Sequence, residues 1–358
     1  MSRIAIDDGA GGHSLALLGP LAQHADHLAQ LAKGKPLICV SDELVWSLHG
    51  PKLSAICEID PILIPRGEEA KAWPTLITLI GELAARNHGR DRALLALGGG
   101  SIGDTAGLAA ALYKRGCPIV HIPTTLLAQV DSAVGGKTAI DAEGEKNLVG
   151  TFHAPALIIA DPAMLTTLDQ RQMRAGMAEI VKYGAIADAA FFRWVEQHGR
   201  AVLDADPDAC TEAAHQCITM KAAAVAGDVQ DLKGQRALLN FGHSFGHAIE
   251  SVAGLGTVLH GEAVAVGMVM AARFSAVTDR CAPAVPDRLE SLLTSLGLPT
   301  RLDQVGLGGR GEQLFGPMRK DKKNLEGGMT LILLEDIGAA RLVNDVSPSQ
   351  LQDFLSSS

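Results

Sequence analysis

Hydrophobic and polar positions follow a strand-and-helix pattern in the first half of the chain. Short, almost continuously apolar runs occupy 36–42, 118–125 and 156–161. The segment 92–113 begins with such a run and continues, past a group of glycines, with helical spacing. Strands that are apolar throughout and separated by helices are typical of a parallel sheet covered on both faces. The pattern predicts an α/β domain with a mostly parallel, Rossmann-like sheet.

Beyond about residue 170 the strand pattern almost disappears. Apolar positions recur at helical spacing through 172–186 and 261–277. One late apolar run, 329–335, fits a strand or one arm of a short hairpin. We therefore expect an α/β domain over residues 1–170 and a mainly α-helical domain over residues 171–358.

Composition narrows the possible partners and compartments. With 358 residues, 47% of them apolar and 20% charged, the chain can bury a large core, which excludes wholesale disorder. A net charge of −9 and only 4% aromatic residues argue against a nucleic-acid or membrane-surface partner. The N-terminus has no signal-peptide pattern, and no apolar run reaches the roughly 18 residues of a membrane span. We expect a cytoplasmic protein that binds neither nucleic acid nor membrane.

The six cysteines contain no Cys-x-x-Cys pair. A chain of this length needs no disulfides, so the spacing favours reduced and mostly buried thiols. Any metal ion must then be held by histidines and carboxylates.

The glycine group Gly98–Gly103 fits G-x-G-x-x-G between an expected strand and an expected helix. Glycines there let backbone N–H groups approach a pyrophosphate at a helix N-terminus. The common Rossmann fingerprint also has an acidic residue about 20 positions later. Here no Asp or Glu lies between Asp104 and Asp131. The motif predicts the phosphate cradle of a different kind of nucleotide site, with a glycine turn that holds no ligand as the alternative.

Two other motif matches fail. Gly136-Lys137-Thr138 is similar to the end of a Walker A loop, but the first glycine of that loop is replaced by Asp131. The segment Gly242–Gly246 matches the G-x-S-x-G turn of hydrolases. The catalytic triad of that fold needs a histidine well downstream of the serine. No histidine follows His260, and Glu250 is the only acid candidate that precedes it, which disfavours a hydrolase.

Histidines and a carboxylate in the second half suggest a metal site. His243 and His247 are four residues apart on an expected helix and so share a face, while His260 begins another helix. Glu179 lies three residues before Lys182, again on one face. Two histidines and a carboxylate form an open set of divalent-metal ligands with room for a substrate oxygen. Spacing alone leaves a metal site and a cluster of packing residues equally open.

Several long motifs occur in a fixed order: RGCPIVHIPTTLLAQVDSAVGGKTAID, AGMAEIVKYG, RALLNFGHSFGHAIE, LHGEAVAVGM and MRKDKK. Together they resemble the 3-dehydroquinate synthase family over about residues 36–340. The resemblance implies NAD on the α/β domain, Zn²⁺ (or Co²⁺) on the helical domain, and an active site in the cleft between the domains. It also implies that 3-deoxy-arabino-heptulosonate 7-phosphate becomes 3-dehydroquinate and phosphate. The implied steps are transient NAD-dependent oxidation, phosphate elimination, re-reduction and an intramolecular aldol cyclisation.

The resemblance also implies roles for individual residues. The metal ligands are Glu179, His243 and His260. The NAD-binding residues are Asp42, Glu68, Lys71, Gly100, Ser101, Ile102, Gly103, Asp104, Thr124, Thr125, Lys137, Lys146, Met164, Leu165, Thr166 and Thr167. The catalytic residues are Asp131, Lys137, Lys182, Arg236, Asn240 and His247, and the further substrate-binding residues are Arg115, Asn147, Lys221 and Lys322. Arg115 resembles a residue that reaches the substrate phosphate in the neighbouring subunit, which implies a homodimer.

The basic residues suit an anionic substrate, because Lys and Arg bind phosphate and carboxylate groups. Lys137 and Lys182 lie in apolar, small-residue sequence, which argues against a free surface position for either. Three features depart from the family pattern. They are Glu145 in place of a glycine, Val229 in place of an acidic residue, and one extra residue between Lys221 and Arg236. They weaken the expectation for Lys221 and leave the metal site unaffected.

Three alternative functions are consistent with parts of this pattern. Related sugar-phosphate cyclases that make valiolone- or inosose-type products share the scaffold, but the unaltered DSAVGGK segment at 131–137 favours dehydroquinate. Metal-dependent polyol dehydrogenases also have a GGGS-x-x-D loop and a helical second domain, and they would release NADH. An inactive ligand-binding relative is disfavoured because no family metal or lysine position is missing.

Overall fold

The chain folds into two compact units in a computed structural model. The structure describes residues 2–7, 13–226, 235–254, 256–320 and 329–358. One unit comprises residues 1–169 with 205–232, and the other comprises residues 170–204 with 233–358. This grouping differs from a single division at residue 170, because helix α7 (Pro207–Ala226) packs against β1 (Ser2–Asp7) and the π-helical turn η4 (Ala128–Ser132).

The first unit is built on a seven-stranded sheet with the order β1-β2-β9-β6-β5-β3-β4. Its other strands are β2 (His13–Leu18), β3 (Leu37–Ser41), β4 (Ile59–Leu63), β5 (Leu94–Gly98), β6 (Ile119–Pro123) and β9 (Leu157–Ala160). All neighbouring pairs are parallel except β1 with β2, which confirms the predicted, mostly parallel sheet. The predicted apolar runs are β3, β5, β6 and β9, which are buried throughout.

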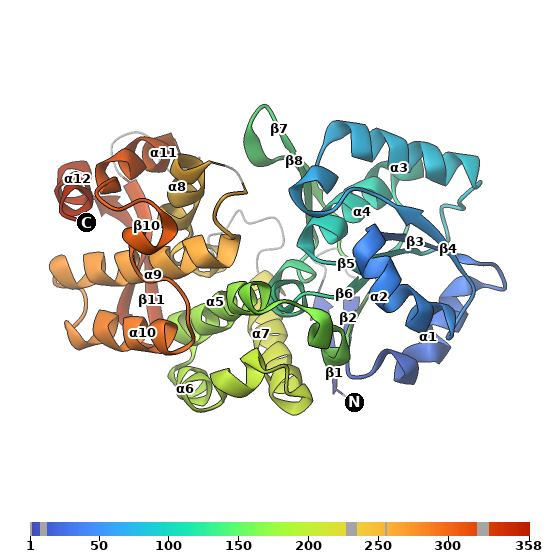
Figure 1. Ribbon diagram of the computed structural model, residues 1–358, viewed down its shortest axis with the longest axis horizontal. Helices are drawn as coiled ribbons and strands as arrows, with labels where there is room; N and C mark the ends of the chain where they lie inside the picture. Colours follow the sequence, from blue (N-terminus) through green and yellow to red (C-terminus); the bar gives the residue numbers. More distant parts are fainter. Residues whose placement is uncertain (1, 8–12, 227–234, 255, 321–328) are drawn as a thin grey trace. The chain divides into compact units, whose positions relative to one another are not determined.

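Alternate residues of these strands face two layers of helices. Helices α3 (Trp73–Ala85) and α4 (Gly100–Leu112) pack with Ile38 and Leu94 on one face of the sheet. Helices α1 (Ala25–Ala32) and α2 (Glu43–Ser54) pack on the other face, beside Leu37 and Leu95. Figure 1 shows these helices on either side of the strands. The two-sided burial explains why the strands are apolar at every position.

A separate hairpin extends the first unit beyond the sheet. Strands β7 (Lys137–Ala142) and β8 (Glu145–Phe152) pair antiparallel. Their turn uses Glu143 and Gly144, both with positive φ, as a two-residue hairpin turn of the primed type requires. The apolar pattern of the sequence did not predict this hairpin, which carries Lys137, Lys146 and Asn147.

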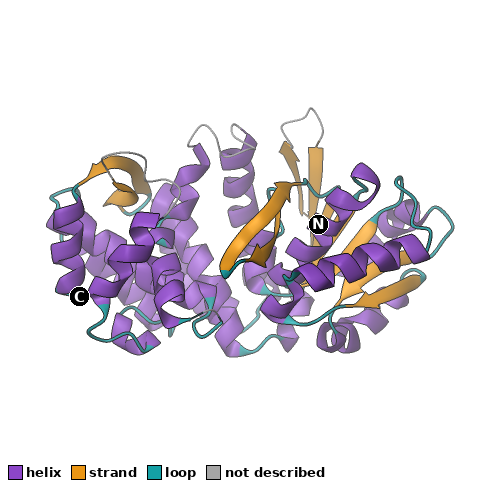
Figure 2. Ribbon diagram, turned by 90° about the horizontal axis from the view of Figure 1, so that it is seen from above, coloured by secondary structure: helices purple, strands orange, loops and turns teal. Residues whose placement is uncertain are grey.

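The second unit is mainly helical, as predicted (Figure 2). Its helices are α5 (Gln170–Ala187), α6 (Ala189–Leu203), α8 (His243–Ala253), α9 (His260–Val277), α10 (Ala284–Ser295), α11 (Phe315–Lys320) and α12 (Pro348–Ser356). The late apolar run is one arm of the antiparallel hairpin β10 (Met329–Asp336) and β11 (Ala339–Val346). Helices α5 and α9 are buried along most of their lengths and pack against each other.

Short 3₁₀ turns connect these elements: η1 (Leu21–His24), η2 (Gly67–Ala70), η3 (Tyr113–Arg115), η5 (Pro162–Thr167), η6 (Gln235–Asn240), η7 (Leu302–Val305) and η8 (Gly311–Leu314). Across the described residues, no helix combines the length and the hydropathy that crossing a membrane would need. All six cysteines are free, and Cys39, Cys117, Cys210 and Cys217 are buried, as the spacing predicted.

Candidate metal centre and nucleotide pocket

Three helices of the second unit bring the predicted metal ligands together. Glu179 lies in the buried middle of α5, His243 is the first residue of α8, and His260 is the first residue of α9. Glu179 Oε1 is 3.7 Å from His243 Nε2 and 3.6 Å from His260 Nε2. One ligand atom from each residue lies within 4.8 Å of the others. The convergence that spacing left open is therefore present in the fold.

The spacing of these atoms fits a single divalent cation. Metal–nitrogen and metal–oxygen bonds near 2.0–2.1 Å in a tetrahedral site separate the donor atoms by roughly 3.3–3.5 Å. Both Glu179 oxygens are fully buried and accept no hydrogen bond from the described residues, although Oε2 is paired with the Lys182 ammonium. A buried carboxylate oxygen between two imidazole nitrogens, with no hydrogen-bond donor, fits the role of a cation ligand.

The Nε2 atom of His243 has a lone pair that a metal ion could accept. Its Nδ1 lies 3.2 Å from the carbonyl oxygen of Phe241, and because a carbonyl only accepts, Nδ1 carries the proton. Burial, followed by the charge of Lys182, holds the pKa of His243 well below its ordinary value. The ring is therefore neutral near pH 7, with the Nε2 lone pair directed toward Glu179.

A close contact and an ion pair fix the start of α9 against α5. The guanidinium of Arg171 donates to both oxygens of Glu262, at 2.6 and 2.8 Å, in a bidentate pair. Glu262 also accepts the Leu259 N–H at 2.9 Å, which caps the first turn of α9. Gly261 lies against the backbone of Ala175, one turn before Glu179, with no room for a Cβ atom. These contacts hold His260 at a set distance from Glu179.

Four other residues with predicted catalytic roles belong to the second unit and lie within a few residues of these ligands along the chain. Lys182 is buried, as its apolar neighbours predicted, and the face it shares with Glu179 is confirmed by their ion pair. The ring centroid of His247 is 5.5 Å from that of His243 and 6.1 Å from that of His260. Arg236 and Asn240 lie on η6, which leads into α8, and Arg236 is buried.

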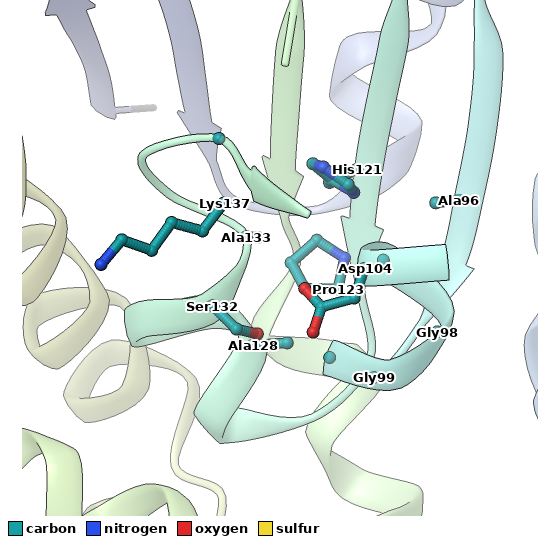
Figure 3. A pocket seen from close by; sticks show the side chains of 13 residues that line it. Ala96, Gly98, Gly99, Asp104, His121, Pro123, Ala128, Ser132, Ala133 and Lys137 are labelled. Atoms are coloured by element: carbon teal, nitrogen blue, oxygen red, sulfur yellow. The ribbon is translucent and has the colours of Figure 1, made fainter. Parts of the chain in front are cut away.

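In the first unit, the predicted glycine loop forms the floor of a pocket (Figure 3). Strand β5 ends at Gly98, and α4 begins at Gly100, so backbone N–H groups at the positive end of a 13-residue helix face the pocket. A Cβ on Gly100 would lie 3.0 Å from Ser132 Oγ and fill part of this space. The pocket is also lined by Gly103, Asp104, His121 and Lys137. Room beside a helix N-terminus suits a pyrophosphate.

A charged network borders this pocket. The Lys71 ammonium donates to Asp104 Oδ2 at 2.7 Å and also to Asn147 Oδ1. Burial pulls the pKa of Lys71 down, but Asp104, Glu68 and Asp141 outweigh it, so the pKa is raised. Burial raises the pKa of Asp104 and of Glu68, against the pull of Lys71. Lys146 also acts on Glu68. The structure thus brings together five predicted residues from η2 with its C-cap, α4 and β8.

The remaining predicted NAD residues lie at the carboxyl ends of the parallel strands or just beyond them. Asp42 follows β3 and caps α2 by accepting the Val45 N–H at 3.0 Å. Thr124 and Thr125 follow β6, while η5 follows β9 and carries Met164, Leu165, Thr166 and Thr167. Ser101 and Ile102 lie in the first turn of α4. Ligands of open α/β sheets bind at this edge.

Two basic residues of the first unit differ from what the sequence led us to expect. Lys137 is exposed, so the prediction that its apolar neighbours would keep it from the surface is wrong. In β7 the side chains alternate, and Thr138 and Ile140 point inward while Lys137 points outward, as Figure 3 shows for Lys137.

The Lys221 ammonium contacts Asp131 twice, at 2.9 Å to Oδ1 and at 2.7 Å to the carbonyl oxygen. This pair supplies a role for Lys221 despite the departures nearby.

Two predictions lie outside the described residues: Lys322, and the Val229 substitution together with the insertion before Arg236. Arg115 is exposed at the end of η3. Its backbone φ of 65° follows Lys114 at 50° and precedes Gly116 at 111°.

Sequence reasoning missed two groups at these sites. Glu250 lies beside His260, with Oε1 3.7 Å from Nδ1. It follows His243 by seven residues, two helical turns, which is the signal that could have placed it on the same face. His121 lines the candidate nucleotide pocket, and burial, followed by His153, lowers its pKa to about 4. A polar residue inside the apolar run 118–125 was its only signal in the sequence.

Comparisons with known proteins agree with this geometry. Residues 61–175 match the family model "3-dehydroquinate synthase N-terminal", and residues 176–324 match "3-dehydroquinate synthase C-terminal". The chain is 40% identical to a 3-dehydroquinate synthase of Shewanella loihica, covering 99% of both chains. It is 45% identical to that of Caulobacter vibrioides, covering 95% of this chain and 94% of the relative.

Two solved structures are similar over nearly the whole chain. One is ValA, a 2-epi-5-epi-valiolone synthase from Streptomyces hygroscopicus with NAD⁺ and Zn²⁺ bound, at a TM-score of 0.87 and 29% identity, covering 100% of this chain and 97% of that one. The other is a 2-deoxy-scyllo-inosose synthase complexed with carbaglucose-6-phosphate, NAD⁺ and Co²⁺, at a TM-score of 0.88 and 25% identity, covering 99% and 100%.

Proposed function

Because this chain belongs to the 3-dehydroquinate synthase family, we propose that it converts 3-deoxy-arabino-heptulosonate 7-phosphate to 3-dehydroquinate and phosphate. The enzyme is a carbon–oxygen lyase that uses NAD and a divalent metal, Zn²⁺ or Co²⁺, and the two similar structures were solved with those groups. The observation that carries the proposal is the convergence of Glu179, His243 and His260 on one point.

The second unit provides the metal site and nearby polar groups. Glu179, His243 and His260 would hold the cation. When bound, the metal supplies Lewis-acid stabilisation of substrate oxygens, and NAD accepts a hydride and later returns it. The buried Lys182 ammonium neutralises Glu179 and places a second positive charge beside the proposed site. The imidazole of His247, one turn along α8, would exchange a proton with the substrate at a ring nitrogen, and Arg236 and Asn240 would bind its oxygens.

The first unit provides the proposed NAD site. Backbone N–H groups of Gly100–Asp104 would bind the pyrophosphate, and Asp42, Glu68, Lys71, Thr124, Thr125, Lys146 and Met164–Thr167 would border the nucleotide. Acidic Asp42 and Glu68 would repel the 2′-phosphate of NADP, which favours NAD. Lys137, Asn147, Lys221 and Asp131 are the proposed substrate contacts of this unit. Lys322, a further candidate, lies outside the described residues.

The exposed position of Arg115 supports the proposal of a homodimer. Three successive residues with positive φ make a tight turn after α4 that exposes this arginine. We propose that it binds the substrate phosphate of a second subunit, in a cytoplasmic dimer. A mixture of two inactive variants, Arg115→Gln and His260→Ala, tests this: mixed dimers would contain one complete site and recover about a quarter of wild-type activity after subunit exchange. If Arg115 acts in its own subunit, no activity returns.

The reaction itself is tested by two simultaneous readings. Purified protein is given the heptulosonate phosphate, a divalent metal and NAD⁺ in less than stoichiometric amount, and both inorganic phosphate and NADH absorbance are followed. We expect phosphate in proportion to substrate with no net NADH. Conversion of the added NAD⁺ to NADH without phosphate release would show a dehydrogenase. Absence of both would refute the proposal.

Two variants connect this activity to the sites. His260→Ala should lose turnover and retained metal, whereas His198→Ala, an exposed histidine of the same unit, should lose neither. Lys137→Ala should reduce turnover, because it removes a proposed substrate contact. Lys52→Ala, an exposed lysine of α2, is its control.

The related cyclases are a second candidate, because the two similar structures are a valiolone and an inosose synthase. Identity separates the groups: the two dehydroquinate synthases described above share 40–45% of residues with this chain, and the two cyclases share 25–29%. Mass spectrometry of the product distinguishes them, since only a dehydroquinate synthase yields a carboxylated ring.

A further inference from the structure

The candidate ligand His260 has a carboxylate on each side of its ring. Its Nε2 is 3.6 Å from Glu179 Oε1, and its Nδ1 is 3.7 Å from Glu250 Oε1. Glu179 comes from α5 and Glu250 comes from α8, so the imidazole of α9 lies between two helices. The two ring nitrogens of His260 therefore face different carboxylates.

Glu250 is in a position that a carboxylate seldom occupies without a partner. Its side chain is 5% exposed, and it shares a helix face with His243, which begins the same helix seven residues earlier. Helix α8 packs along α9, so the carboxylate is directed at the first turn of α9 rather than at solvent. The imidazole Nδ1 of His260 lies beside this buried carboxylate, and an imidazole N–H can donate to it.

We propose that Glu250 is a positioning residue for the metal site: it accepts the Nδ1 proton of His260 and so leaves the Nε2 lone pair directed at the cation. The inference rests on the metal of the proposed function. It requires a single tautomer, since a proton on Nε2 would block the ligand atom. A carboxylate beyond the ligating histidine also makes that histidine a stronger donor.

His243 supports this role by using a different partner for the same purpose. Its Nδ1 donates to the Phe241 carbonyl oxygen, so its tautomer is fixed by its own backbone. His260 is the first residue of its helix, and its Nδ1 faces Glu250 instead. The two candidate histidine ligands thus have different acceptors for the Nδ1 proton, and each acceptor leaves Nε2 directed toward Glu179.

The same atoms allow one competing arrangement. His247, Glu250 and His260 also offer ligand atoms within 4.8 Å of one another, so Glu250 could itself bind a second cation. His247 is exposed. If His260 joined that set through Nδ1, it would have to lose the proton that the positioning role assigns to this atom. The positioning role needs neither feature, and the stoichiometry of metal binding separates the two.

The test compares Glu250→Gln with wild type in Co²⁺ binding by metal-free protein. Glutamine keeps the size of the side chain, removes the charge, and can present its amide N–H to Nδ1, which favours the wrong tautomer. Visible absorbance of Co²⁺ gives both affinity and ligand geometry without any turnover. We expect affinity to fall by about 10–100-fold with one Co²⁺ still bound per chain.

The matched control is Glu290→Gln, which removes a carboxylate paired with Arg273 in the same unit and should leave Co²⁺ affinity unchanged. Unchanged affinity in Glu250→Gln overturns the inference and leaves the proposed function standing. Two Co²⁺ ions on wild type, with one lost in the variant, also overturn it. A wild-type protein that binds no Co²⁺ instead refutes the metal site itself.

A second measurement needs no folded variant of Glu250. Ring ¹⁵N chemical shifts of Zn²⁺-loaded wild type report which nitrogen of each histidine carries a proton, and His260→Gln identifies the His260 signals. We expect protonated Nδ1 and unprotonated Nε2 for His260 near pH 7. A proton on Nε2 overturns the inference.

Discussion

Substitution of Gly261 by alanine should separate the two helices that carry Glu179 and His260. A Cβ atom at Gly261 would lie 2.5 Å from the Cα and the carbonyl carbon of Ala175, and closer still to its oxygen. Real Cβ atoms essentially never come within 3.0 Å of a heavy atom from another part of the chain. Because the neighbouring atoms are backbone, no side-chain rotation relieves the contact.

The size of the effect follows from this geometry. Because the carbonyl oxygen of Ala175 is the nearest atom, the start of α9 must move by at least about 1 Å away from α5. Overpacking of this kind costs about 1–3 kcal/mol of unfolding free energy. The melting temperature should fall by roughly 2–12 °C in a unit of this size. Since metal sites tolerate errors of only about 0.2 Å in ligand distance, metal affinity should fall by at least about tenfold.

Gly316→Ala is the matched control. Gly316 lies in α11 of the same unit, has no positive φ, and has no heavy atom within 4 Å of the position that an alanine methyl would take, so alanine there should cost nothing. Calorimetric melting and Zn²⁺ competition with a chromophoric chelator provide the two readings. Equal melting temperature and equal zinc affinity in Gly261→Ala and Gly316→Ala would refute the close contact as the element that sets the ligand distance.

Three further predictions concern stability and reactivity. Burial lowers the pKa of His121 from 6.5 to about 4, so the unfolded chain binds a proton at a higher pH than the folded protein does. The unfolding free energy should therefore fall as the pH drops from 6.5 to about 4. In urea titrations, His121→Gln should show a smaller fall than wild type. Thiol reagents should label the native protein slowly and first at the partly exposed Cys57 and Cys281, whose pKa values are raised by burial; mass spectrometry that found a buried thiol labelled first would contradict the fold. Arg171→Ala should cost no more than about 1 kcal/mol in chemical denaturation, because half of the arginine in its pair with Glu262 is exposed, and a much larger loss would show that solvent does not weaken this pair.

The sequence predicted best those strands in which every residue is buried. Strands β3, β5, β6 and β9 are buried at every residue, so their apolar runs stand out. Strand β4 was missed because Asp60 and Pro61 interrupt it at the edge of the sheet, where a proline is tolerated. The β7–β8 hairpin was missed because its residues are only partly buried.

The sequence predicted which candidate site residues share the face of one helix. It did not predict which helices pack against each other. Spacing placed His243 and His247 on one face, and Glu179 and Lys182 on another, because those separations are short. That α5 and α9 would meet depends on the missing side chain of Gly261 against Ala175, a tertiary contact without local signature. The family motifs supplied the grouping that periodicity could not.

The central claim is that Glu179, His243 and His260 hold one divalent cation. Anomalous diffraction at the zinc absorption edge, from crystals grown with Zn²⁺, tests it most directly. We expect one anomalous peak bonded to Glu179 Oε1 and to the Nε2 atoms of His243 and His260, and its loss in crystals of His260→Ala. A peak elsewhere, or three side chains turned away from one another with no peak among them, would contradict the claim.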